Sequence, residues 1–330
     1  MISITKALRF TQRNHYNPCF WTALWNPDFY SAIVDGQGAA GDARKQLVYA
    51  LNIKTGQIRK TSVNDVHYDK DMGVAEISRE AAEDFARRYH PEEYEQFLVD
   101  NADAHYPVYI DFEEFFTGIE RMSPYDVLLQ VARSAKINTV WNKTELAVFV
   151  LLQQVRSHSV LNATIEWGEE LGQHKFEAFI TLKWLFQDPK ELSRLILPLV
   201  GGRWTFFSTD KDTFPLCDSP VLVQPHSVMV ALSPRLLLEI QPLVHRPVDK
   251  MPRVRRRIKK SKIDEFRRRT IGNTFREIIF GNLDTMKAWQ ESFEFKERVT
   301  LMKDTKKYNR LVLAEDNREL WHINALGNME

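Results

Sequence analysis

Hydrophobic and polar positions alternate in two short stretches near the N-terminus. Residues 45–51 and 57–63 both carry β-branched or aromatic side chains, and residues 54–56, which end in a glycine, lie between them. Because glycine and short polar residues favour tight turns, the two stretches predict a β-hairpin. We expect the chain up to about Ile77 to consist of strands and loops.

The spacing of apolar residues becomes helical from Ser78 to about Leu195. The helices expected from this spacing are 79–88, 93–100, 111–135, 143–170 and 175–195. The helix from Lys143 is the most apolar, so we expect it to be central. Asn142 with Glu145 three residues later predicts an N-cap and a capping box at its start.

Strand patterns return after Gly201 and Gly202. The expected strands are 203–208, 220–223 and 228–232. Ser233 followed by Pro234 is typical of a helix start, which predicts a short helix through Leu238. The remaining segments expected are a helix from 263 to about 280, further helix in the tail and a strand at 310–314.

The composition favours a globular protein with a sizeable core. The chain has 330 residues, of which 44% are hydrophobic and 27% are charged. Because no repeat or long linker divides the chain, we expect one interlocked domain over 1–330. It is strand-rich at 1–77, helical at 78–195 and mixed at 196–330. The predicted class is α+β, with a central helical core packed with antiparallel strands from the N-terminal and C-terminal thirds.

Charge and cysteine content argue against several protein classes. A formal net charge of +1 gives no long-range attraction to nucleic acid or to an anionic membrane. Cys19 and Cys217 lie far apart and outside any CxxC pair, so neither a zinc knuckle nor a disulfide framework is indicated. The longest apolar runs fall short of the ~20 residues that cross a bilayer. With no signal-peptide pattern at the start, we expect a cytoplasmic protein with no membrane partner.

One segment departs from this charge balance. Ten Lys or Arg residues lie between Arg253 and Arg269, against only Asp264 and Glu265. Such a cluster can neutralise phosphates, which makes nucleic acid or another anion the expected partner. The candidate nucleic-acid-binding residues are Arg253, Arg255, Arg256, Arg257, Lys259, Lys260 and Lys262. The alternatives are a solvated mobile loop and a charge run resembling a nuclear-import signal.

A second set of candidates combines polar side chains with predicted burial. Gln153 and Arg156 lie on or beside the apolar stripe of the helix from Lys143. A buried Arg156 needs an anionic partner. Asp218 lies where a turn is expected to enter a buried strand, and its carboxylate suits a bidentate pair with Arg156. His15 titrates near neutral pH and is a candidate general acid or base.

Together these residues would form a polar pocket suited to hydrolysis or transfer at a phosphate. The candidate catalytic residues are His15, Gln153, Arg156, Asp218 and Asn273. No metal ligand is assigned, because the histidines show no HExxH or paired spacing. A divalent metal remains a candidate cofactor, since carboxylates and phosphates both bind one.

The same residues also have structural interpretations. Asp218 before Ser219 and Pro220 is typical of an Asx turn, and Arg156 can tie that turn to the helix. His15 can instead bond a backbone carbonyl in an aromatic N-terminal plug.

Short segments in a shared order resemble the uncharacterised family called domain of unknown function 4238. They are His15-Tyr16-Asn17-Pro18, the helix segment 146–156, Cys217-Asp218-Ser219-Pro220-Val221 and Leu232-Ser233-Pro234. Residues 273–280 are similar to the asparagine-led helix that follows in the family. Two departures are Cys217, where the family has a hydroxyl residue, and Ser157-His158 in place of a proline-containing sequence. The resemblance implies no activity.

Two functions are therefore open. The first is an enzyme acting on a phosphate-bearing substrate, a nuclease or nucleotide hydrolase, with His15 as acid or base, Arg156 holding charge and Asp218 orienting or binding metal. The second is a non-catalytic module that binds nucleic acid or an acidic protein through residues 253–269. Convergence of the candidate catalytic residues on a solvent-reachable cleft would favour the enzyme, and their occlusion would favour the module.

Overall fold

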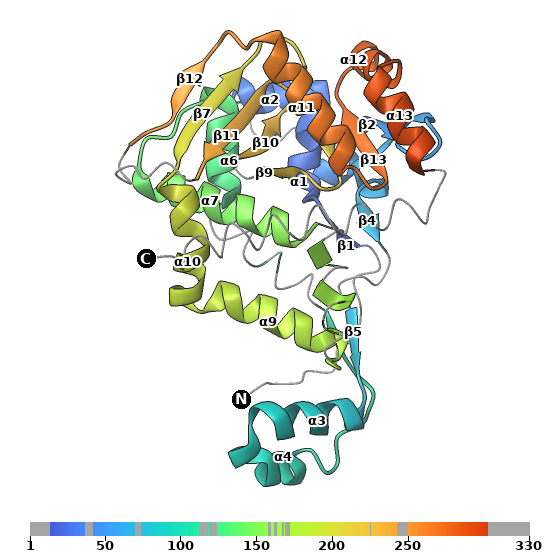
Figure 1. Cartoon of the computed structure of the whole chain (residues 1–330), viewed down its shortest axis with the longest axis vertical. Coiled ribbons are helices and arrows are strands. Elements are labelled where there is room, and N and C mark those ends of the chain that lie inside the picture. The colour runs from blue at the N-terminus through green and yellow to red at the C-terminus, as the bar shows by residue number, and fades with distance from the viewer. Residues whose placement is uncertain are drawn as a thin grey trace.

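Two larger sheets, two short ribbons and a set of helices make up the described part of the chain in the computed structural model (Figure 1). The described residues are 14–36, 42–69, 74–111, 116, 118, 124–157, 160–161, 164–166, 168, 172–224, 226–242 and 250–302. Helices and mainly antiparallel sheets share one hydrophobic core, so the predicted α+β class is confirmed. The strand predicted at 310–314 lies outside the described residues.

The larger sheet has five strands in the order β12-β7-β11-β10-β9. Their bounds are Arg253–Arg255 for β12, Arg203–Ser208 for β7, Leu236–Gln241 for β11, Ser227–Ser233 for β10 and Val221–Gln224 for β9. Neighbouring strands are antiparallel except for β12, which pairs parallel to β7 at the sheet edge.

The second sheet joins strands from the N-terminal and C-terminal thirds of the chain in the order β3-β2-β13-β8. Its strands are Ile58–Ser62 for β3, Leu47–Asn52 for β2, Glu277–Phe280 for β13 and Leu216–Cys217 for β8. Strands β2 and β3 form the predicted hairpin. The two ribbons pair β1 (Asn14–His15) with β4 (Tyr68–Asp69) and β5 (Val74–Ile77) with β6 (Val108–Asp111).

The helices lie around and below the five-stranded sheet (Figure 1). They are α1 Cys19–Thr22, α2 Pro27–Val34, α3 Arg79–Tyr89, α4 Tyr94–Asp100, α6 Pro124–Ser134, α7 Val140–Val155, α9 Lys175–Gln187, α10 Pro189–Val200, α11 Lys260–Asn273, α12 Leu283–Gln290 and α13 Phe293–Met302. Helices α3 and α4 lie at the end of the molecule opposite β12 and α11. No helix in the described ranges has both the length and the apolar character needed to cross a bilayer.

Helix α7 packs against α6 and α10 and carries the centre of the core. Leu146, Phe149 and Val150 on this helix are fully buried, as its apolar pattern predicts. The predicted N-cap was wrong, since the Thr139 hydroxyl accepts the N–H of Asn142 at 3.1 Å. The helix ends at Val155, whereas the prediction continued it to residue 170 through positions that are partly outside the described ranges.

Two predicted helices were wrong because long-range strand pairing overrides local signals. Residues 236–241 form β11, which completes the sheet between β10 and β7 and outweighs the local Ser-Pro helix-start signal. The helix predicted to reach residue 280 ends at Asn273, and Glu277–Phe280 is the buried strand β13. Thus the asparagine-led helix at 273–280 suggested by the family resemblance is a helix end followed by a strand.

Proline and turn chemistry explain two further differences. The helix predicted at 175–195 is two helices, since Asp188 caps α10 by accepting the N–H groups of Lys190 and Glu191 and Pro189 opens it. Helix α2 was not predicted, although Asn26 followed by Pro27 is a start signal, and its side chain accepts the Phe29 N–H.

Candidate functional site

Asp218 lies in a fully buried turn between β8 and β9. One carboxylate oxygen accepts the backbone N–H of Phe275 at 2.9 Å, and the other accepts those of Arg276, at a short distance, and Glu277, at 3.2 Å. Burial raises the pKa of this carboxyl, while His67 and the three N–H donors oppose the rise. The expected ion pair with Arg156 is not formed between these two described residues, because backbone amides satisfy the carboxylate instead.

Asn273 holds the same turn from the end of α11. Its side-chain amide donates to the carbonyl of Ser219 at 2.9 Å and, more weakly, to that of Val221 at 3.4 Å. Asp218 and Asn273 therefore hold the same turn. The contacts they make are with main-chain groups, which fix the turn against α11 and β13.

His67 is a central member of this buried cluster that the sequence did not indicate. It is 2% exposed and adopts a left-handed backbone with φ +51°, which is uncommon for a residue other than glycine. The Asn17 amide donates to its Nδ1 at 2.7 Å and to the Cys217 carbonyl at 2.8 Å, so Nε2 carries the proton and donates to the Glu277 carbonyl at 3.2 Å. Burial lowers the pKa of His67, which favours this neutral form.

His15 lies beside this cluster on β1. Its Nδ1 bonds the backbone carbonyl of Val66 at 3.1 Å, which is the structural alternative that the sequence left open. Burial first, then the positive charge of Arg156, lowers the pKa of His15 to about 4. With this pKa, His15 is almost fully unprotonated and only weakly basic at neutral pH. Its pKa is therefore far from the value near 7 that is typical of a general base.

Gln153 and Arg156 occupy the buried end of α7. Gln153 is 0% and Arg156 3% exposed, and the guanidinium of Arg156 lies 5.3 Å from the ring centroid of Phe116. The structure thus brings His15 near Arg156 and Asp218 near Asn273. Since the carboxylate and the guanidinium are both buried, the arrangement favours a structural polar core that joins distant chain segments.

The basic segment, in contrast, lines an open groove whose lining residues come from β7, β11, β12 and the start of α11. We call it the basic groove, with a volume of about 340 Å³. Its cationic lining residues are Arg203, Arg253, Arg255, Arg257, Lys259 and Lys262. Of the predicted binding residues, Arg256 and Lys260 are exposed but are not part of the lining.

Strand register explains which side chains face the groove. Arg253 lies opposite Thr205 and Arg255 opposite Phe207, so these residues share one face of the sheet. Arg256 follows the end of β12, in a bend, and is not part of the lining. The sequence identified the basic segment as a binding candidate. Arg203, some fifty positions earlier, joins the groove lining because β7 pairs with β12 and β11, which the sequence did not show.

The acid in the groove is neutralised by one lysine. The Nζ atom of Lys262 lies 2.7 Å from Glu239 and 2.7 Å from Glu265. Burial opposes the charge on Lys262, but the bonds to these two carboxylates outweigh it, so the pKa of Lys262 is raised. Within the described ranges, Arg253, Arg255, Arg257 and Lys259 form no ion pair, which leaves four cations available to an external anion.

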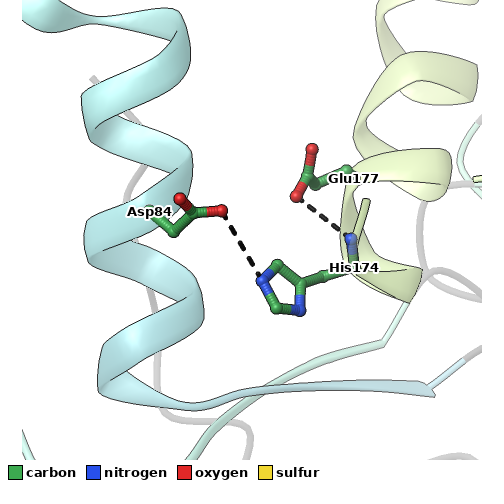
Figure 2. A group of neighbouring side chains, drawn as sticks. All are labelled: Asp84, His174 and Glu177. Carbon is green, nitrogen blue, oxygen red and sulfur yellow. Dashed lines mark hydrogen bonds and ion pairs between the residues drawn. The ribbon is translucent and has the colours of Figure 1, made fainter. Parts of the chain in front are cut away.

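A separate group of candidate metal ligands joins α3 to α9. The ligand atoms of Asp84, His174 and Glu177 lie within 4.8 Å of one another, and Figure 2 shows the three side chains. One guanidinium nitrogen of Arg88 is 2.6 Å from both carboxylates, so it takes the position that a cation would share. The Glu177 carboxylate also accepts the backbone N–H of His174 at 3.1 Å. These contacts favour a structural ion-pair cluster between the two helices.

Comparison of the chain with protein-family models, curated proteins and solved structures gives no match. The resemblance to domain of unknown function 4238 therefore stays a prediction, and function rests on the geometry.

Proposed function

We propose that this protein is a non-catalytic binding module for phosphate-bearing anions, nucleic acid above all, and that the basic groove is its binding site. The observation that supports this most is the row of cations Arg253, Arg255, Arg257 and Lys259, which line one groove and form no ion pair in the described ranges.

The physical argument concerns repulsion between like charges. Guanidinium groups gathered in one groove raise its positive potential, and a bound anion relieves this repulsion. Arginine forms two parallel hydrogen bonds to a phosphate, so several arginines on one face suit a phosphate-bearing partner. Helix α11 adds to this attraction, because its N-terminal end carries a partial positive charge and begins beside the groove at Lys260.

The test is fluorescence anisotropy with a labelled oligonucleotide over a range of salt concentrations. The double variant Arg253→Glu/Arg255→Glu is compared with Lys183→Glu/Lys190→Glu, which makes the same change of charge at exposed lysines on α9 and α10. We expect the native protein to bind at low salt, with affinity falling steeply as salt rises. The groove variant should bind about tenfold or more weakly, and the control variant within about twofold of native.

Two results would contradict the proposal. Equal weakening in both variants would show that net charge alone matters, and no binding by the native protein at low salt would exclude nucleic acid as the partner. The same samples with magnesium added also test the hydrolase hypothesis. Cleavage of the strand that is lost in folded Asp218→Asn protein would favour an enzyme over a binding module.

A further inference from the structure

A second basic hollow lies farther along α11. It is lined by Gln224, Glu265, Arg268 and Arg269. Arg268 is exposed, and Arg269 bonds both Glu265 and the hydroxyl of Ser227. This hollow extends the positive surface from β12 and β7, at one edge of the sheet, toward β10 and β9, at the opposite edge.

The two hollows adjoin through an ion pair on α11. Lys262, which lines the basic groove, contacts Glu265, which lines the second hollow, at 2.7 Å. Residues 261, 265 and 268 follow helical spacing and lie on one face of α11. As α11 runs along this face it contacts β11 through Lys262 and Glu239, then β10 through Arg269 and Ser227, then β9 through Asn273. Lys262, Arg268 and Arg269, the α11 cations that line the two hollows, therefore follow one another as the helix crosses the sheet.

The length of this series of cations limits what can bind all of it. Nine residues separate Lys259 from Arg268, which at 1.5 Å per residue is about 14 Å. A single phosphate or a mononucleotide reaches one hollow. Contact with both needs an extended chain that carries several phosphates.

The floor of the groove indicates how such a chain would bind. Phe207 is the aromatic side chain in the lining, and it is only 5% exposed. Stacking of bases on exposed rings is therefore a minor contribution, and the affinity comes from phosphates. The basic groove, with its volume of about 340 Å³, has the size of a pocket for a drug-sized molecule, so it admits part of one unpaired strand and not a duplex.

We propose that the basic groove and the second hollow form one continuous track for single-stranded nucleic acid, bound through successive phosphates and with little base preference. This inference rests on the proposed function, because the basic groove is the first half of the track. It adds the chemical class of the partner and assigns Arg268 as a residue that contacts only the longer strands.

The experiment measures the affinity of the full chain for oligothymidylates from about two to about sixteen nucleotides, a range that covers the usual site sizes of single-strand binders. The native affinity should rise with length and then level off once a strand reaches both hollows. Arg268→Glu should leave the affinity for the dinucleotide within about twofold while removing most of the gain with length. Arg255→Glu should weaken binding at every length. The matched control is Lys183→Glu, at an exposed lysine of α9 outside both linings.

The outcomes separate this inference from the proposed function. Equal affinity for short and long strands would overturn the continuous track. So would an Arg268→Glu variant that binds the dinucleotide and the longest strand with the same loss of affinity. In both cases the basic groove would still bind anions. If neither short nor long strands bind at low salt, the proposed function itself fails. Tighter binding of a duplex than of either of its separated strands, at the same salt, would overturn the choice of a single strand.

Discussion

The carboxylate of Asp218 accepts the backbone N–H of Phe275 at 2.9 Å, although 57 positions separate the two residues in the sequence. With the two further N–H groups that it accepts, Asp218 ties the turn before β9 to the segment that enters β13. Strand β13 pairs with β2 on one side and β8 on the other. The Asp218 side chain therefore stabilises a sheet whose strands come from the N-terminal and C-terminal thirds of the chain.

Replacement of Asp218 by alanine should destabilise the fold strongly. Three N–H groups, one of them in a buried bond, would lose their acceptor at the fully buried Asp218 position, and we expect the free energy of unfolding to fall by roughly 3 kcal/mol or more. Asp218→Asn keeps one acceptor oxygen and should lose less. Urea unfolding measures the effect, with Asp210→Ala as the control at an exposed site, where the change should stay within about 0.5 kcal/mol. Equal stability of Asp218→Ala and native protein would exclude this structural role.

The pH dependence of stability should carry a contribution from His15. Its pKa is about 4 in the folded chain against an ordinary value of 6.5, so the unfolded chain binds the proton more readily. The His15 contribution to the free energy of unfolding is therefore fully present above about pH 6.5 and falls as the pH drops toward about 4. The His15→Gln variant lacks this contribution. The difference in free energy of unfolding between the native protein and the variant should therefore shrink as the pH falls from about 6.5 to about 4.

The measurement is urea unfolding at a series of pH values. His105→Gln, at an exposed histidine, is the control and should give a profile parallel to that of the native protein. Parallel profiles for His15→Gln and native protein would show that His15 titrates alike in the folded and unfolded chains.

Arg88 should determine whether the cluster between α3 and α9 binds a metal. Arg88→Ala leaves the Glu177 carboxylate, which is 3% exposed, without its cation, and we expect a loss of roughly 1–2 kcal/mol after allowing for the partial exposure of Arg88. In this variant Asp84, His174 and Glu177 are open to zinc, so zinc should raise its Tm more than that of the native protein. Arg88→Ala/His174→Ala is the control and should not gain this effect. An equal rise of Tm with zinc in native and Arg88→Ala protein would mean that the Arg88 guanidinium does not compete with zinc for the two carboxylates.

Local patterns predicted those elements whose contacts are local. The hairpin of β2 and β3 follows from alternation and a turn within one short stretch, and α7 follows from its own apolar spacing. Strand β13 was missed because the run Ile278-Ile279-Phe280 fits a buried helix or a buried strand equally well. Its pairing with β2, more than two hundred positions away, decides between the two.

The candidate sites show the same division. The burial of Asp218 and Arg156 was predicted from position, but the partners of Asp218 are backbone amides, which carry no sequence signature. Arg253 and Arg255 were recognised by charge. Their orientation into the groove follows from β12, and a strand of three residues with an exposed edge has too little pattern to predict.

Removal of the negative charge from the groove floor should strengthen anion binding. Glu239 is 6% exposed, lines the basic groove and holds Lys262 at 2.7 Å. Glu239→Gln removes a repulsive charge yet keeps an acceptor for Lys262, so we expect oligonucleotide binding to tighten by roughly two- to tenfold at low salt, with the difference shrinking as salt rises. Glu291→Gln, at an exposed acid that follows the end of α12, is the matched control. Anisotropy titrations check both variants after circular dichroism shows native-like folding. Unchanged or weaker binding by folded Glu239→Gln protein would place the bound anion away from this groove.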